Sequence, residues 1–184
     1  MYREQAPDEE KPAVRWLPFQ LNPDLPAEGI SRQEYIERKW GKAGNKYERV
    51  AAVGREVGID FAFDAIKVQP NTVDAHRLMR YGATHEREDA VAESLFAGYF
   101  KEGADLTDKK TLADIGARAG LERDLLEAYL DSDEDRDTIL NGDLEARQNG
   151  VNGVPFFIFN RKVAVSGAHE PETLLKAMLD SQQE

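Results

Sequence analysis

The sequence contains no cysteine among its 184 residues. This absence excludes disulfide bonds, thiolate nucleophiles and cysteine-ligated metals within the chain. Histidine is also scarce, because the three histidines, His76, His85 and His169, lie far apart and form neither an HxxH nor an HExxH pair. Since protein zinc sites need clustered ligands, we expect no metal site and no cofactor.

Long apolar runs are absent too. No stretch approaches the roughly 18 apolar residues of a membrane span, and the polar, acidic first residues do not resemble a signal peptide. We therefore expect a cytoplasmic protein without membrane association. The net charge is −11, and lysine and arginine alternate with acidic residues instead of forming a basic patch. Because such a charge repels phosphate backbones, we expect no nucleic-acid partner.

Apolar residues nevertheless make up 41% of the chain and charged residues 32%, which indicates a folded core beneath a charged surface. Helical spacing dominates between an early strand, expected at 14–20, and a late hairpin. A capping box at Ser31 and Glu34 predicts one helix start, and Asn71 is a predicted N-cap. The expected helices cover 31–40, 45–57, a segment after Asn71, 87–101, 107–119, 122–130, 132–148 and 171–179.

The sharpest local pattern is the stretch Gly150–Phe159. Two glycines permit a backbone path that side chains would forbid, and Val154-Pro155 then leads into four apolar residues that predict a buried strand. Proline cannot donate to a sheet, so it should lie at or just before the start of this strand. The turn also predicts a cis bond before Pro155. Asn160-Arg161 predicts a tight hairpin that leads to a second strand at 162–165.

Three segments occur in a characteristic order: Arg15–Pro23 (Arg-Trp-Leu-Pro-Phe-Gln-Leu-Asn-Pro), Pro70–Leu78, and Gly150–Phe159 followed by Ser166-Gly167-Ala168. Together they resemble the FrnE-like branch of the DsbA family, which is related to 2-hydroxychromene-2-carboxylate isomerase and kappa-class glutathione transferases. The resemblance covers about 14–179. It implies an α/β fold, thioredoxin-like (DsbA-like) with a large all-helical insertion. Residues 1–29 and 150–184 would form the thioredoxin-like part, and 30–149 the insertion.

Members of this branch begin with a strand and a Cys-x-x-Cys helix, which precede the Arg-Trp-x-Pro-Phe-Gln segment. Only twelve residues precede Ala13 here, and none is a cysteine. We therefore expect the N-terminal βα unit to be missing, no catalytic residue to be present, and the chain to be redox-inactive. An incomplete sheet would leave unpaired edges, so a homodimer through an exposed edge is a further expectation.

The resemblance implies a substrate site at the loop before Pro155, where the main chain of Val154 would face an extended peptide or thiol substrate. Asn71 and His76 also have a purely structural interpretation, as an N-cap and a half-buried histidine. Three functions stay open: a disulfide oxidoreductase relative without its cysteines, a binding module for a peptide or small acid, and a relative of glutathione-dependent isomerases. The expected site residues are Gly153, Val154, Pro155, Phe19, Asn22, Asn71, Thr72, His76 and Ser166.

Overall fold

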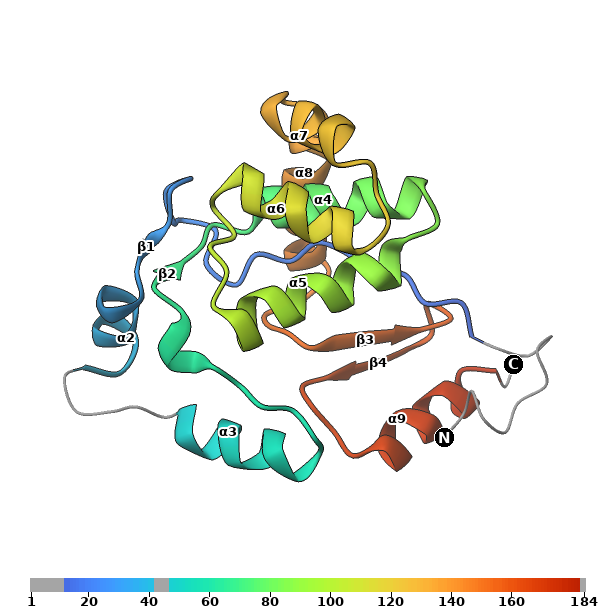
Figure 1. Cartoon of the computed structure of the whole chain (residues 1–184). Helices are drawn as coiled ribbons and strands as arrows, with labels where there is room; N and C mark the ends of the chain where they lie inside the picture. Colours follow the sequence, from blue (N-terminus) through green and yellow to red (C-terminus); the bar gives the residue numbers. More distant parts are fainter. Residues whose placement is uncertain (1–11, 42–46, 183–184) are drawn as a thin grey trace. The chain divides into compact units, whose positions relative to one another are not determined.

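The computed structural model of the protein describes residues 12–41 and 47–182 (Figure 1). The chain divides into two compact units. The hairpin unit combines Met1–Leu21 with Asn141–Glu184, and the helical unit comprises Asn22–Leu140. The two units meet at 21/22 and 140/141. The second of these positions falls inside helix α8 (Arg136–Gln148). The domain boundaries expected from the sequence, 29/30 and 149/150, stay a prediction.

The helical unit contains two short strands and most of the helices. Its elements are β1 (Ile30–Ser31), α2 (Arg32–Trp40), α3 (Tyr47–Glu56), the 3-10 turn η3 (Phe63–Ala65), β2 (Val68–Gln69), α4 (Val73–Thr84), α5 (Glu88–Glu102), α6 (Lys109–Arg118) and α7 (Arg123–Asp131). The start expected at 45 for the second helix lies outside the described residues. Within 12–41 and 47–182, no helix has both the length and the apolar character needed to cross a membrane.

Among the described residues, side-chain caps begin α2 and α6. Ser31 accepts a hydrogen bond from the main-chain N–H of Glu34 at 3.1 Å, which confirms the predicted cap of α2. Asp108 caps α6 by accepting from two main-chain N–H groups of its first turn. The prediction for α4 was wrong by one residue, because Thr72 occupies the N-cap position. Asn71 instead accepts from the N–H of Val73 at 3.0 Å, so its side chain closes the turn that precedes the helix.

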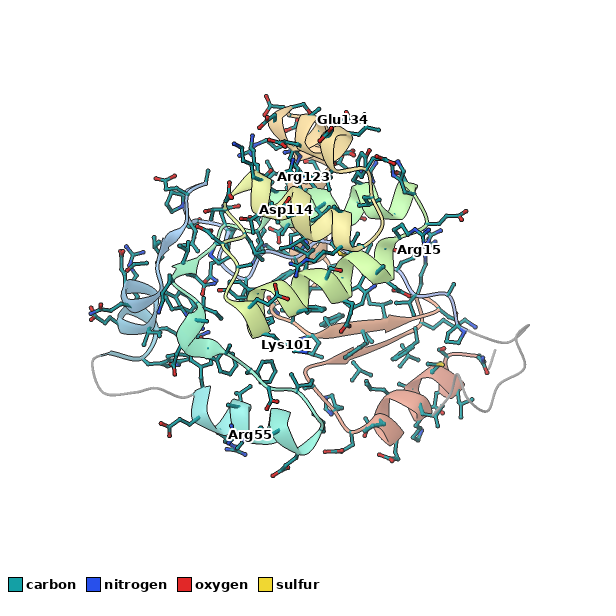
Figure 2. All side chains as sticks on the ribbon, in the orientation of Figure 1. Arg15, Arg55, Lys101, Asp114, Arg123 and Glu134 are labelled. Atoms are coloured by element: carbon teal, nitrogen blue, oxygen red, sulfur yellow. The ribbon has the colours of Figure 1, made fainter. Side chains whose placement is uncertain are left out.

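The buried apolar core lies in the helical unit, where α4, α5, α6 and α7 pack together (Figure 1). Leu78 of α4 and Leu112 and Ile115 of α6 are fully buried at its centre. The axes of α6 and α7 approach closely at Gly116, where a Cβ atom would lie 2.2 Å from the side chain of Leu126. On the outer surface, Asp114 of α6 and Arg123 of α7 lie side by side and pair at 2.6 Å (Figure 2).

The pairing of β1 with β2 was not predicted from the sequence. The two strands run antiparallel, with Ile30 opposite Gln69 and Ser31 opposite Val68. Gly29, just before β1, adopts φ = +71°, and a Cβ atom there would lie 2.5 Å from the main-chain oxygen of Gln69. A residue without a side chain is needed here for both reasons.

The hairpin unit contains the predicted hairpin and the last helix. Strand β3 (Phe156–Phe159) runs antiparallel to β4 (Val163–Ser166), and α9 (Pro171–Asp180) packs against β4. Asn160 and Arg161 both adopt positive φ values, and the N–H of Lys162 returns to the oxygen of Phe159 at 3.0 Å. Phe159 therefore faces Val163, and β4 begins one residue later than expected.

The strand predicted at 14–20 is not present, and this prediction was wrong. No strand among the described residues pairs with this segment, and its Pro18 lies against Gly142 of α8. The N–H of Gln20 donates to Asp143 at 2.6 Å, and Arg147 donates to the oxygen of Gln20. Side chains of a helix thus satisfy main-chain groups that a neighbouring strand would otherwise satisfy.

Candidate functional site

The loop between α8 and β3 is fixed at its start on the last turn of α8. The N–H of Val151 donates to the oxygen of Ala146 at 3.0 Å, and the side chain of Val151 is buried. Gly150 makes the reversal with φ = +85°, and the Asn152 side chain donates to the Gly150 oxygen at 3.0 Å. These contacts set the direction in which the chain leaves the helix.

The loop is fixed again at its end by the sheet. The bond between Val154 and Pro155 is cis, and the oxygen of Pro155 accepts from the N–H of Gly167 at 2.9 Å. That bond extends the β3–β4 ladder by one pair beyond Phe156 and Ser166. Ser166 is exposed, and its main-chain oxygen lies 3.0 Å from Nε2 of His169.

Val154 lies between these two anchors. Val154 is 53% exposed. Among the described residues, none forms a hydrogen bond with the N–H or the C=O of Val154. An exposed donor and acceptor on an anchored main chain can pair with an extended polypeptide, as one strand pairs with another.

Phe19 belongs to the irregular segment before Asn22 and contacts α8, the helix that anchors the loop. The Arg147 guanidinium sits 4.4 Å from the centre of its ring, within the range of a cation–π contact. Arg147 also donates from Nε to Asp143 at 2.9 Å, and Asp143 is almost fully buried. Phe19 and the start of the loop are therefore both held by the last turns of α8.

The remaining predicted site residues gather at the start of α4 in the helical unit. The Asn71 side chain donates to the oxygen of Leu25 at 2.8 Å, and the N–H of Leu25 donates to the oxygen of Asn22 at 3.3 Å. The N–H of His76 donates to the oxygen of Thr72 at 3.0 Å, and His76 is half-buried. The predicted residues thus form two groups, one in each unit: Gly153, Val154, Pro155, Phe19 and Ser166; Asn22, Asn71, Thr72 and His76.

Comparison with known proteins gives the family. The sequence profile of the DSBA-like thioredoxin domain matches residues 2–179. The chain belongs to this family. The fold is similar to that of a probable DsbA oxidoreductase from Streptomyces coelicolor, known from a crystal structure. The TM-score is 0.81 at 23% sequence identity, over 89% of this chain and 73% of that chain. No curated protein matches the chain. The DsbA-like thioredoxin fold predicted from the sequence is confirmed.

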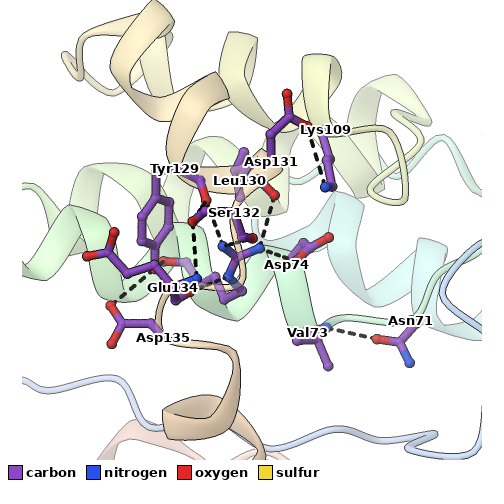
Figure 3. A network of polar contacts seen from close by, with 11 residues as sticks. Asn71, Val73, Asp74, Lys109, Tyr129, Leu130, Asp131, Ser132, Glu134 and Asp135 are labelled. Carbon is purple, nitrogen blue, oxygen red and sulfur yellow. Dashed lines mark hydrogen bonds and ion pairs between the residues drawn. The ribbon is translucent and has the colours of Figure 1, made fainter.

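One feature of this DsbA-like domain was missed by the sequence-based reasoning, although it lies next to His76. Arg77 is only 2% exposed. Its hydrogen-bond partners are Asp74 and residues of the end of α7 and the turn after it, which are labelled in Figure 3. It donates to Asp74 at 2.8 Å and stacks on the Tyr129 ring at 4.9 Å. It also donates to four main-chain oxygens, those of Tyr129, Leu130, Ser132 and Glu134.

Arg77 therefore satisfies the C-terminal carbonyl groups of α7, which have no partner within the helix. Burial, and next to it the charge of Asp135, raises the pKa of the Tyr129 hydroxyl, so this ring stays neutral beside the guanidinium. A sequence signal existed, because Arg77 follows Val73 by four residues and so lies on the buried face of α4. Its partners, 52 to 57 residues further along the chain, could not be inferred from that position.

Proposed function

We propose that this domain, as a member of the FrnE-like branch of the DsbA family, binds an extended polypeptide through the main chain of Val154. One observation carries this proposal. Val154 presents, at an exposed position between an anchor at Val151 and an anchor at Pro155, an N–H and a C=O that no described residue bonds. Because both ends of the loop are fixed before any ligand arrives, little conformational entropy is lost on binding.

Recognition by the main chain has a consequence for the range of ligands. Strand-like pairing derives its affinity from hydrogen bonds common to all peptides, and side chains only adjust it. The proposed ligand is therefore an unfolded or extended polypeptide of broad sequence, and not one defined motif. The uncharged surroundings, from Val151 to Asn160, favour apolar segments.

The proposed function is binding without disulfide exchange. Exchange requires a thiolate that attacks a disulfide, and none of the 184 residues is a cysteine. We expect dithiothreitol to reduce insulin disulfides at the same rate with this chain as without any added protein. A rate clearly above that background would contradict this part of the proposal.

A small-acid or glutathione site at the start of α4 is less well supported. The first free N–H of that helix, on Val73, is already bonded to Asn71. Asp74 adds a negative charge in the first turn, where a bound carboxylate would otherwise be favoured by the helix dipole. Both features disfavour the binding of a carboxylate at the start of α4, so an extended polypeptide remains the proposed ligand.

Two variants at one position test the recognition. Val154→Pro removes the main-chain donor, whereas Val154→Ala keeps the main chain and shortens only the side chain. With reduced, carboxymethylated ribonuclease A as an unfolded probe, the proline variant should bind about 2- to 13-fold more weakly, since one hydrogen bond contributes about 0.5–1.5 kcal/mol. The alanine variant should bind nearly as the wild type does. Equal affinity for all three proteins would refute recognition by the Val154 main chain.

A further inference from the structure

The outer edge of β3 is defined by one hydrogen bond. Neighbouring residues of a strand direct their main-chain groups to opposite sides, so the bond from Gly167 to the oxygen of Pro155 sets the alternation. The N–H and C=O groups of Phe157 and Phe159 then face β4. Those of Phe156 and Ile158 face away from it and form the outer edge of the strand, and Val154 lies just before this edge, in the bend that leads into β3.

This edge is unpaired in the part of the chain that the structure describes. The sheet that contains β3 has two strands, and β4 occupies only the inner side. Outside the β3–β4 ladder, none of the described residues forms a hydrogen bond with the main chain of Val154, Phe156 or Ile158. Phe156 and Ile158 therefore direct two donors and two acceptors outward, since each of them carries one of each.

The edge also lacks the features that usually prevent strand pairing. Natural edge strands are usually protected from pairing by charged residues, by a bulge or by a proline on the edge. Here no charged residue occurs from Val151 to Asn160, and the strand reads Phe-Phe-Ile-Phe. Val154, just before the strand, and Ile158 within it are 53% and 52% exposed. Such aromatic and β-branched residues favour strand pairing.

We propose that β3 of one copy pairs antiparallel with β3 of a second copy, so that two hairpins form a four-stranded sheet about a twofold axis. An antiparallel edge is complementary to itself under such an axis, which makes a second copy a fitting partner. The strand is already ordered by β4 and the turn at Asn160, so pairing loses less entropy than ordering a free peptide. The uncharged edge lets two chains of net charge −11 meet without placing like charges in contact.

The interface would be small, and the dimer accordingly weak. Paired strands of this length bury less surface than the roughly 1,200 Å² of stable complexes. The pairing does not rest on the proposed function. If that function holds, however, the dimer covers Val154, and a bound polypeptide and a second copy exclude each other.

Analytical ultracentrifugation of the whole chain across a wide range of concentrations tests the pairing. The mass should rise from that of a monomer towards twice that value. Ile158→Pro removes an outward N–H that makes no bond within the hairpin, so the variant should fold and remain monomeric. Ile158→Lys places a charge on the edge and should also remain monomeric. Leu144→Lys, on an exposed residue of α8, adds the same charge elsewhere and should dimerise as the wild type does.

Three results would overturn the pairing: a monomer at every concentration, a dimer that persists in both Ile158 variants, or growth beyond a dimer, because a twofold edge contact closes on itself. The ribonuclease probe separates this inference from the proposed function. A wild type that never dimerises but still binds the probe through Val154 would refute only the pairing. A chain that dimerises at high concentration but does not bind the probe at concentrations where it is a monomer would refute only the proposed function.

Discussion

Replacing Arg77 by methionine should destabilise the helical unit more than any change of a surface charge. The side chain is buried, and its guanidinium donates to the oxygens of Leu130, Ser132 and Glu134 as well as to Asp74. Methionine keeps the length and the apolar contact with the Tyr129 ring but removes every donor.

The expected loss of stability follows from the groups that lose their hydrogen bond to Arg77. The oxygen of Tyr129 retains bonds from the N–H of Ser132 at 3.2 Å and from its hydroxyl at 2.7 Å, so it adds little to the loss. The other three oxygens lose their donor, and Asp74 loses its cation. Breaking a buried ion pair of this kind costs about 3–5 kcal/mol, and we expect a loss of that size in the free energy of unfolding.

The matched control is Arg80→Met, one turn further along α4. Arg80 pairs with Asp135 at 2.5 Å, but its side chain is 45% exposed. Such pairs contribute about 1 kcal/mol or less. Urea denaturation followed by far-ultraviolet circular dichroism compares the two variants directly. A difference between them below about 1 kcal/mol would refute the reasoning that the buried guanidinium holds the turn after α7.

Three further predictions concern a cap, a turn and a buried hydroxyl. Asp108→Ala should cost about 1 kcal/mol in urea denaturation; hydrogen bonds lower the pKa of Asp108, so its contribution should be present above pH 3.8 and fade as the pH falls further. Gly29→Ala should destabilise more than Gly41→Ala, because both have φ near +70° but only Gly29 has a neighbouring oxygen in the way. Equal losses would argue against that steric contact. Burial raises the pKa of Tyr99 to about 12, so stability should fall between pH 10 and about 12, and Tyr99→Phe should lessen that fall.

Much of the local structure could be predicted from the sequence, because the signals are local. The cap at Ser31, the proline that begins α9 and the paired strands after Pro155 depend on neighbours only a few residues away. The DsbA-like fold followed from three segments in order. Its confirmation came from the family match over residues 2–179.

The errors have a common physical origin. Residues 14–20 have the composition of a strand, but a strand forms only where another main chain pairs with it, and here Asp143 and Arg147 take that place. The pairing of β1 with β2 involves two residues on each side, too few to produce a pattern. Contacts between residues more than 30 positions apart in the sequence produce no pattern in the spacing of neighbouring residues, so they could not be predicted from it.

The candidate site was predictable in part. The loop at Val154 was marked by its glycines and proline, but the hydrogen bond from Gly167 to Pro155, which fixes the end of the loop on the sheet, could not be inferred from the sequence. The residues Asn22, Asn71, Thr72 and His76 lie in the other unit, and their role in substrate binding stays a prediction.

The most direct test of the proposed function is a titration of the ¹⁵N-labelled chain with reduced, carboxymethylated ribonuclease A. The account predicts that the amide signals of Gly153, Val154, Phe156 and Ile158 shift or broaden first, while those of the first turn of α4 stay in place. Perturbation centred on Asn71–His76, or no perturbation at saturating probe, would contradict it.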